Sequence, residues 1–75
     1  MKQYVEVLAK FDLAGQIIPL YIKLHDKRYQ IDKVKFIRQA ASLKAGGMGL
    51  RYTCLIARQE FYLFLEDNKW FIDKP

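Results

Sequence analysis

Seventy-five residues, 52% of them apolar and 15% aromatic, are enough for one small folded domain and argue against a disordered chain. A domain of this size buries only about 60% of its unfolded surface, which leaves room for a shallow groove but excludes a deep enclosed active site. The net charge of +5 is concentrated in residues 23–58, where nine basic side chains face two acidic ones. This local excess either attracts anionic partners or simply keeps the protein soluble.

Apolar and polar residues alternate with a period of two along most of the chain, which predicts β-strands. The first strand covers residues 4–13, and Gly15 then turns the chain into a second strand over residues 17–24. Pro19 has no backbone N–H, so we expect it near the start of this strand or at a sheet edge. A short polar break over residues 25–28 has the length that joins antiparallel strands.

A third strand follows this break, and its alternation slips by one residue. Tyr29 and Ile31 share one face, whereas the next apolar pair is Val34 and Phe36. One extra residue restores the phase, so the sequence predicts a β-bulge near residues 32–33.

The segment between the third and fourth strands has a different composition. Residues 39–45 could form one helical turn, and the glycines among residues 46–49 predict a connecting loop. A phosphate-binding loop would require a helix directly after it, whereas a strand follows here. The remaining strands are predicted over residues 50–56, 61–66 and 70–73.

These elements predict a single all-β domain over residues 1–75. Five to six short antiparallel strands would form a small curled sheet or an SH3-like or OB-like barrel, with a glycine-rich loop. The sequence does not distinguish the two barrel topologies. A two-layer α+β fold, with residues 39–45 as its helix, is the alternative.

The sequence offers little that could support catalysis or metal binding. Cys54 is the only cysteine and is predicted to face inward from a strand, while His25 is the only histidine and lies in a predicted turn. One cysteine and one histidine cannot fill a tetrahedral zinc site, and nothing brings them together as a nucleophile and base. We therefore expect a non-enzymatic protein with no catalytic residues, no metal and no cofactor.

The lone cysteine also excludes an intramolecular disulfide, which suits a reducing compartment. The apolar runs are far shorter than the roughly 20 residues that a membrane-spanning helix needs, and the first residues lack the apolar segment of a signal peptide. The expectation is a cytoplasmic protein that does not enter a membrane.

The basic residues support binding to single-stranded nucleic acid or another polyanion. Small β domains bind single strands by combining lysine and arginine for the phosphates with aromatic rings for the bases. Tyr29, Tyr52 and Trp70 are candidate rings, although the alternation turns the two tyrosines inward. The predicted nucleic-acid-binding residues are Lys33, Lys35, Arg38, Lys44 and Arg51.

A second hypothesis comes from residues 61–65, where both strand faces are apolar instead of one. Leu55, Tyr62 and Phe64 would then point outward together. Such a patch predicts an interface with a protein partner or a second copy of the chain. Alternatively, the N-terminal strand or residues 39–49 cover it.

Three short motifs, spread over about residues 15–72, resemble a group of small bacterial proteins whose domain has no assigned function. The motifs begin with Tyr29-x-Ile31-Asp32-Lys33-Val34, continue with Gly47-x-Gly49-x-Arg51-Tyr52, and end with Trp70-Phe71. The resemblance implies a bacterial cytoplasmic β domain, and it implies no catalytic or binding residue.

Overall fold

The structure is a computed structural model that describes residues 2–39 and 49–73 of the chain. These residues form strands and turns, and none of them belongs to a helix that could cross a membrane. The strands are β1 (Lys2–Tyr4), β2 (Glu6–Phe11), β3 (Ile17–Leu24), β4 (Lys27–Gln30), β5 (Lys33–Gln39), β6 (Leu50–Ile56), β7 (Gln59–Glu66) and β8 (Lys69–Asp73).

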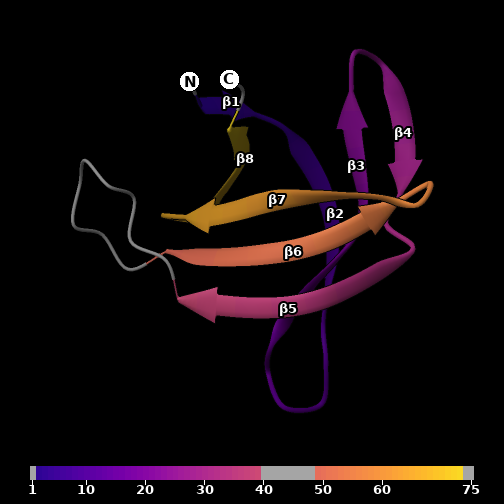
Figure 1. The fold of residues 1–75 in the computed structure, drawn as a ribbon. Helices are drawn as coiled ribbons and strands as arrows, with labels where there is room; N and C mark the ends of the chain where they lie inside the picture. The colour runs from indigo at the N-terminus through magenta and orange to yellow at the C-terminus, as the bar shows by residue number, and fades with distance from the viewer. Residues whose placement is uncertain (1, 40–48, 74–75) are drawn as a thin grey trace.

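Two antiparallel sheets make up the fold, and the strands of the smaller sheet run across those of the larger one (Figure 1). The larger sheet has the order β1-β8-β7-β6-β5, and the smaller sheet has the order β2-β3-β4. The prediction of an all-β domain with a small curled sheet is confirmed. The sheets do not close into a barrel, because β5 remains at the edge of one sheet and β4 at the edge of the other.

The described residues form eight strands where five to six were predicted, because the chain changes sheets inside two of the predicted strands. Val5 separates β1 from β2, and its backbone N–H donates a hydrogen bond to the carbonyl of Trp70 at 3.0 Å. Ile31 and Asp32 separate β4 from β5, and the backbone N–H of Asp32 donates to the carbonyl of Leu55 at 2.8 Å. The alternation of side chains continues through Val5, because Val5 and Val7 both pack on the core. It slips after Ile31, because Ile31 and Val34, three positions apart, both face the core.

The predicted β-bulge occurs later than expected. Val34 and Phe36 pair with consecutive residues of β6, so the extra residue lies between them rather than at residues 32–33. As a result Ile37, and not Phe36, packs against the core, while Phe36 is 51% exposed on the opposite face. The sequence-based assignment of Phe36 to the inner face was wrong.

The predicted helical turn over residues 39–45 begins in a strand, because Gln39 pairs with Leu50 as the last residue of β5. The other residues of that segment, and the glycine-rich stretch up to residue 48, lie outside the described residues. Gly49, which is described, is buried immediately before β6.

Three strand pairs are joined by two-residue hairpin turns in which both residues have positive φ. The turns are His25-Asp26, Ala57-Arg58 and Asp67-Asn68, with φ between 49° and 68°. Two consecutive positive φ angles match the right-handed twist of the strands, which is why such turns are favoured in hairpins. Asparagine and aspartate tolerate this geometry, whereas alanine and arginine do so at a cost.

The core lies between the two sheets. The larger sheet contributes Tyr52, Cys54 and Leu63, and the smaller sheet contributes Ile22. Tyr52 is 0% exposed, and its hydroxyl donates a hydrogen bond of 2.6 Å to the carbonyl of Ile17 on β3. A buried tyrosine usually needs such a partner, because its hydroxyl would otherwise lose its hydrogen bond to water.

Replacing Tyr52 with phenylalanine should lower the free energy of unfolding by about 1–2 kcal/mol, because the Ile17 carbonyl loses its donor in a dry environment. Urea unfolding measures the change. Tyr62→Phe is the control, since its exposed side chain should change stability by less than about 0.5 kcal/mol. Equal stability of the two variants would show that the hydrogen bond between the sheets contributes nothing.

Changing the Ala57-Arg58 turn to Asn-Gly should stabilise the protein by about 1 kcal/mol, because both new residues adopt positive φ more easily. The backbone N–H of residue 57, which donates to Asp32 Oδ2 at 2.9 Å, is kept. Thermal unfolding should shift upward by about 4–8 °C. The converse change Asn68→Ala should lower the midpoint, and a lower midpoint for Asn-Gly would contradict the strain assigned to this turn.

Candidate functional site

The surface of the larger sheet that faces away from the smaller one carries most of the predicted binding residues. Tyr52 and Cys54 point into the core, so the alternate residues of β6, namely Arg51, Thr53 and Leu55, point the other way. The pairing registers extend this outer face to the neighbouring strands. It comprises Lys2, Tyr4, Lys33, Lys35, Phe36, Arg38, Arg51, Thr53, Leu55, Glu60, Tyr62, Phe64, Glu66, Lys69, Phe71 and Asp73.

One row of residues crosses all five strands of the outer face. Arg38 pairs with Arg51, which pairs with Phe64; Phe64 pairs with Phe71, which pairs with Tyr4. Strands lie about 4.8 Å apart, so the row places two guanidinium groups beside three aromatic rings. A basic half and an aromatic half therefore meet in the middle of the sheet.

The aromatic half of the row is packed as a small layer of its own. The rings of Phe64 and Phe71 stack with centroids 5.0 Å apart at 8°, and Tyr4 meets Phe71 edge-on at 5.8 Å. The amine of Lys2 lies 4.6 Å from the centre of the Phe71 ring. Phe71 is consequently only 4% exposed although it does not belong to the core between the sheets.

The adjacent row carries two exposed rings. Phe36 and Tyr62 both pair with Thr53, which lies between them on β6 and is buried. The guanidinium of Arg38 lies 5.4 Å from the centre of the Phe36 ring, and that of Arg51 lies 4.8 Å from the centre of the Tyr62 ring. Each ring is therefore flanked by a cation and still about half exposed to solvent, at 51% for Phe36 and 49% for Tyr62.

The outer face is basic, with six Lys and Arg residues against three Asp and Glu residues, a balance of +3. Lys35 pairs with Glu60 at 3.0 Å and Lys2 with Glu66 at 3.1 Å. Among the described residues no carboxylate pairs with Arg38 or Arg51, and the buried Nε of Arg51 has no hydrogen-bond partner. Lys33 and Lys69 likewise form no ion pair among the described residues, so the two arginines and these two lysines together give the face its excess positive charge.

The structure brings together both sets of residues that the sequence singled out. Lys33, Lys35, Arg38 and Arg51 lie on the outer face, and Lys44 lies outside the described residues. Leu55, Tyr62 and Phe64 lie on the same face, so the polyanion hypothesis and the protein-interface hypothesis concern one surface.

The aromatic residues of the face were only partly found from the sequence. Of the three candidate rings, Tyr52 is buried, Trp70 packs on it with centroids 5.3 Å apart, and Tyr29 lies in the smaller sheet. The sequence analysis did not include Tyr4 or Phe36 among the candidate rings. Tyr4 belongs to a separate three-residue strand that alternation alone does not show, and Phe36 changes face because of the bulge.

The described residues do not assemble a catalytic or metal-binding cluster. No group of three or more His, Cys, Asp or Glu side chains that could hold a metal occurs in residues 2–39 and 49–73. Burial raises the pKa of the Cys54 thiol from its ordinary value of 9.0 to about 11, so the reactive thiolate is scarce at neutral pH. His25 lies in the exposed β3–β4 turn.

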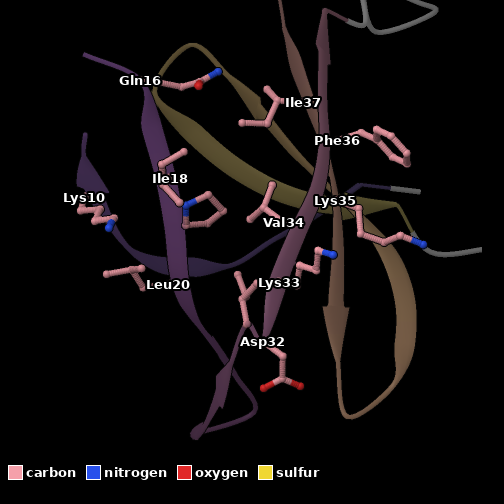
Figure 2. A pocket seen from close by; sticks show the side chains of 12 residues that line it. Lys10, Gln16, Ile18, Leu20, Asp32, Lys33, Val34, Lys35, Phe36 and Ile37 are labelled. Atoms are coloured by element: carbon pink, nitrogen blue, oxygen red, sulfur yellow. The ribbon is translucent and has the colours of Figure 1, made fainter. Parts of the chain in front are cut away.

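Two hollows lie where the sheets are open. A groove of about 600 Å³ lies between β3 and β5, and Figure 2 shows side chains from both strands along it. A second hollow of about 680 Å³ has a mostly apolar lining that includes Ile22, Tyr29, Phe61 and Ile72. Both hollows border the core, because neither end of the sandwich is closed by a paired strand.

No family model, curated protein or solved structure matches the chain. The resemblance to small bacterial proteins stays a prediction, and function must be argued from the surfaces themselves.

The buried thiol predicts a specific dependence of stability on pH. The folded protein holds the Cys54 proton more tightly than the unfolded chain, so this contribution to stability is constant below pH 9.0 and is lost as the pH rises toward about 11. Urea unfolding from pH 7 to pH 11 should show a steeper alkaline loss for the natural protein than for Cys54→Ala. Parallel curves for the two proteins would contradict the raised pKa.

Proposed function

We propose that the protein binds single-stranded nucleic acid on the outer face of its larger sheet. The observation that carries the proposal is the contact of Arg38 with Phe36 and of Arg51 with Tyr62. Each ring is half exposed, and neither arginine pairs with a carboxylate of residues 2–39 or 49–73. Phosphate groups would accept hydrogen bonds from the guanidinium groups, and bases would stack on the exposed rings.

The spacing of the rings favours single strands over duplexes. Phe36 and Tyr62 lie on strands separated by β6, so their backbones are about 10 Å apart, twice the spacing of neighbouring strands. Stacked bases in a duplex rise by only about 3.4 Å per step. Bases that contact both rings must therefore be unstacked, as they are in single strands.

The charge of the face separates this proposal from its main alternative. A homodimer through Leu55, Tyr62 and Phe64 would bring two faces of balance +3 together, and like charges at an interface oppose association. A bound polyanion would instead relieve the repulsion among the positive charges of one face. The alternative still predicts a measurable dimer, whose sedimentation coefficient would fall on Tyr62→Ala.

Fluorescence anisotropy of labelled single-stranded RNA, single-stranded DNA and duplex DNA, at about 50 and about 200 mM salt, tests the proposal. We expect saturable binding that prefers single strands and weakens at higher salt. Tyr62→Ala should weaken binding about tenfold through lost stacking. Arg38→Gln should weaken it and lower the dependence on salt by the equivalent of about one phosphate contact.

Arg28→Gln is the matched control, because Arg28 also lies over a ring, at 5.8 Å from the centre of Tyr21, but on the smaller sheet. It removes the same charge from the protein and should leave specific binding within about twofold of the natural protein. If Arg28→Gln and Arg38→Gln weaken binding equally and all three nucleic acids bind alike, net charge alone is responsible. Absence of binding at the lower salt concentration would overturn the proposal.

A further inference from the structure

The groove between β3 and β5 is bounded by a strand edge of each sheet. Among the described residues, β5 pairs only with β6 and forms the edge of the larger sheet. β3 pairs with β4 only from Tyr21 onward, and in its first half the carbonyls of Ile17 and Leu20 accept hydrogen bonds from the Tyr52 hydroxyl and the Ile31 N–H. Pro19 lies in this half, at a sheet edge as the sequence predicted, where its missing N–H is tolerated.

Apolar and polar residues both line the groove, and its ends differ. In Figure 2, Val34 and Ile37 point from β5 toward β3, whereas Lys35 and Phe36 point away to the outer face. Ile18 and Pro19 line the groove from β3. One end is bounded by the chain where it crosses between the sheets near Asp32, and Gln16 and Ile37 lie toward the other end.

An exposed edge strand carries backbone N–H and C=O groups that point away from its only neighbour. An extended peptide satisfies those groups by adding a strand, and alternate side chains of the peptide then point to the same side. The groove supplies both requirements, since β5 offers an edge for the peptide backbone, and Ile18, Pro19, Val34 and Ile37 offer apolar contacts for every second side chain.

Charge determines which peptide fits. Lys10, Lys33 and Lys35 line the groove with Asp32 as the only acidic residue. Lys35 already pairs with Glu60, and Asp32 accepts a hydrogen bond from the backbone of Ala57. Lys10 and Lys33 remain without a carboxylate among the described residues, so acidic side chains on the peptide are favoured.

The same charges oppose a second copy of the chain as the occupant. β5 carries Lys33, Lys35 and Arg38 and no acidic residue, so pairing β5 with β5 would join two basic strands. Basic residues on an edge strand are a common protection against such self-pairing.

We propose that this groove binds an extended segment of a partner protein by β-strand addition to β5. Alternate apolar side chains of the segment pack on Val34, Ile37 and Pro19, and the acidic side chains between them point to the outer face, beside Lys33. The backbone and apolar contacts use the edge and the inward side chains of β5 and do not require nucleic-acid binding, whereas Lys33 is shared with the outer face.

Selection from a phage-displayed library of random peptides tests this inference without a known partner. We expect enriched peptides that alternate acidic and apolar residues. In NMR titrations with one such synthetic peptide, the amide signals of β5 and of the first half of β3 should shift. Methylation of those peptide backbone nitrogens whose N–H groups face β5 should abolish binding, because it removes the donors of the hydrogen bonds to β5.

Lys33→Glu is the decisive variant, since Lys33 lies on β5 beside the added strand and has no carboxylate partner among the described residues. It should weaken peptide binding about tenfold. Lys23→Glu is the matched control, with the same change in net charge at a residue that does not line the groove. No enrichment, enrichment of peptides without the acidic pattern, shifts confined to other strands, or equal effects of the two variants would each overturn the inference.

Discussion

The hydrogen bond from the Tyr52 hydroxyl to the Ile17 carbonyl joins the middle of β6 to the first residue of β3, and the arrangement of both surfaces depends on it. Tyr52 is fully buried, and Trp70 packs against its ring on the inner side of the larger sheet. Since side chains alternate along a strand, the inward position of Tyr52 fixes Arg51 and Thr53 outward. The same contact draws the first half of β3 toward the larger sheet and so forms one wall of the groove.

The larger sheet has apolar side chains on both faces, although only one face meets the smaller sheet. The described strands outside the larger sheet all belong to the smaller one, so none of them forms a layer over the second face. The outer face is covered instead by its own side chains, with Phe64 and Phe71 stacked and Tyr4 and Lys2 packed around them. Burial of Phe71 contributes to stability there, whereas Phe36 and Tyr62 remain half exposed. The part of the face that stabilises the fold and the part that is free to bind are thus different residues of one surface.

The sequence predicted the strands well and their assignment to sheets poorly. Two-residue turns such as Asp67-Asn68 were recognisable, because residues that tolerate positive φ are visible in the sequence. The crossing at Val5 was not, since Val5 is an apolar residue that continues the alternation, and the slip after Ile31 was interpreted as a bulge instead of a crossing. The bulge was misplaced for a related reason. Phe36 and Ile37 are both apolar, and only the pairing with β6 decides which of them faces the core.

The binding residues show the same limit. Charge is a property of composition, so the basic residues of β5 and β6 could be chosen from the sequence alone. Their placement over particular rings depends on register, because Arg38 and Arg51 are neighbours only through the pairing of two strands. Tyr4 and Phe71 are 67 positions apart and meet through the pairing of β1 with β8. No local pattern in the sequence contains that contact.

β5 connects the two proposed sites, because its outward side chains belong to the outer face and its inward ones to the groove. A peptide strand added to β5 would extend the larger sheet by one strand beyond Phe36 and Arg38, and alternate side chains of that peptide would continue the outer face. Acidic side chains at those positions would oppose a nucleic acid bound beside them, and apolar or basic ones would not. Coupling between two sites is reciprocal, so nucleic acid on the outer face would change the affinity for the peptide by the same factor. The edge of β5 is therefore the part of the fold where one partner could regulate the other.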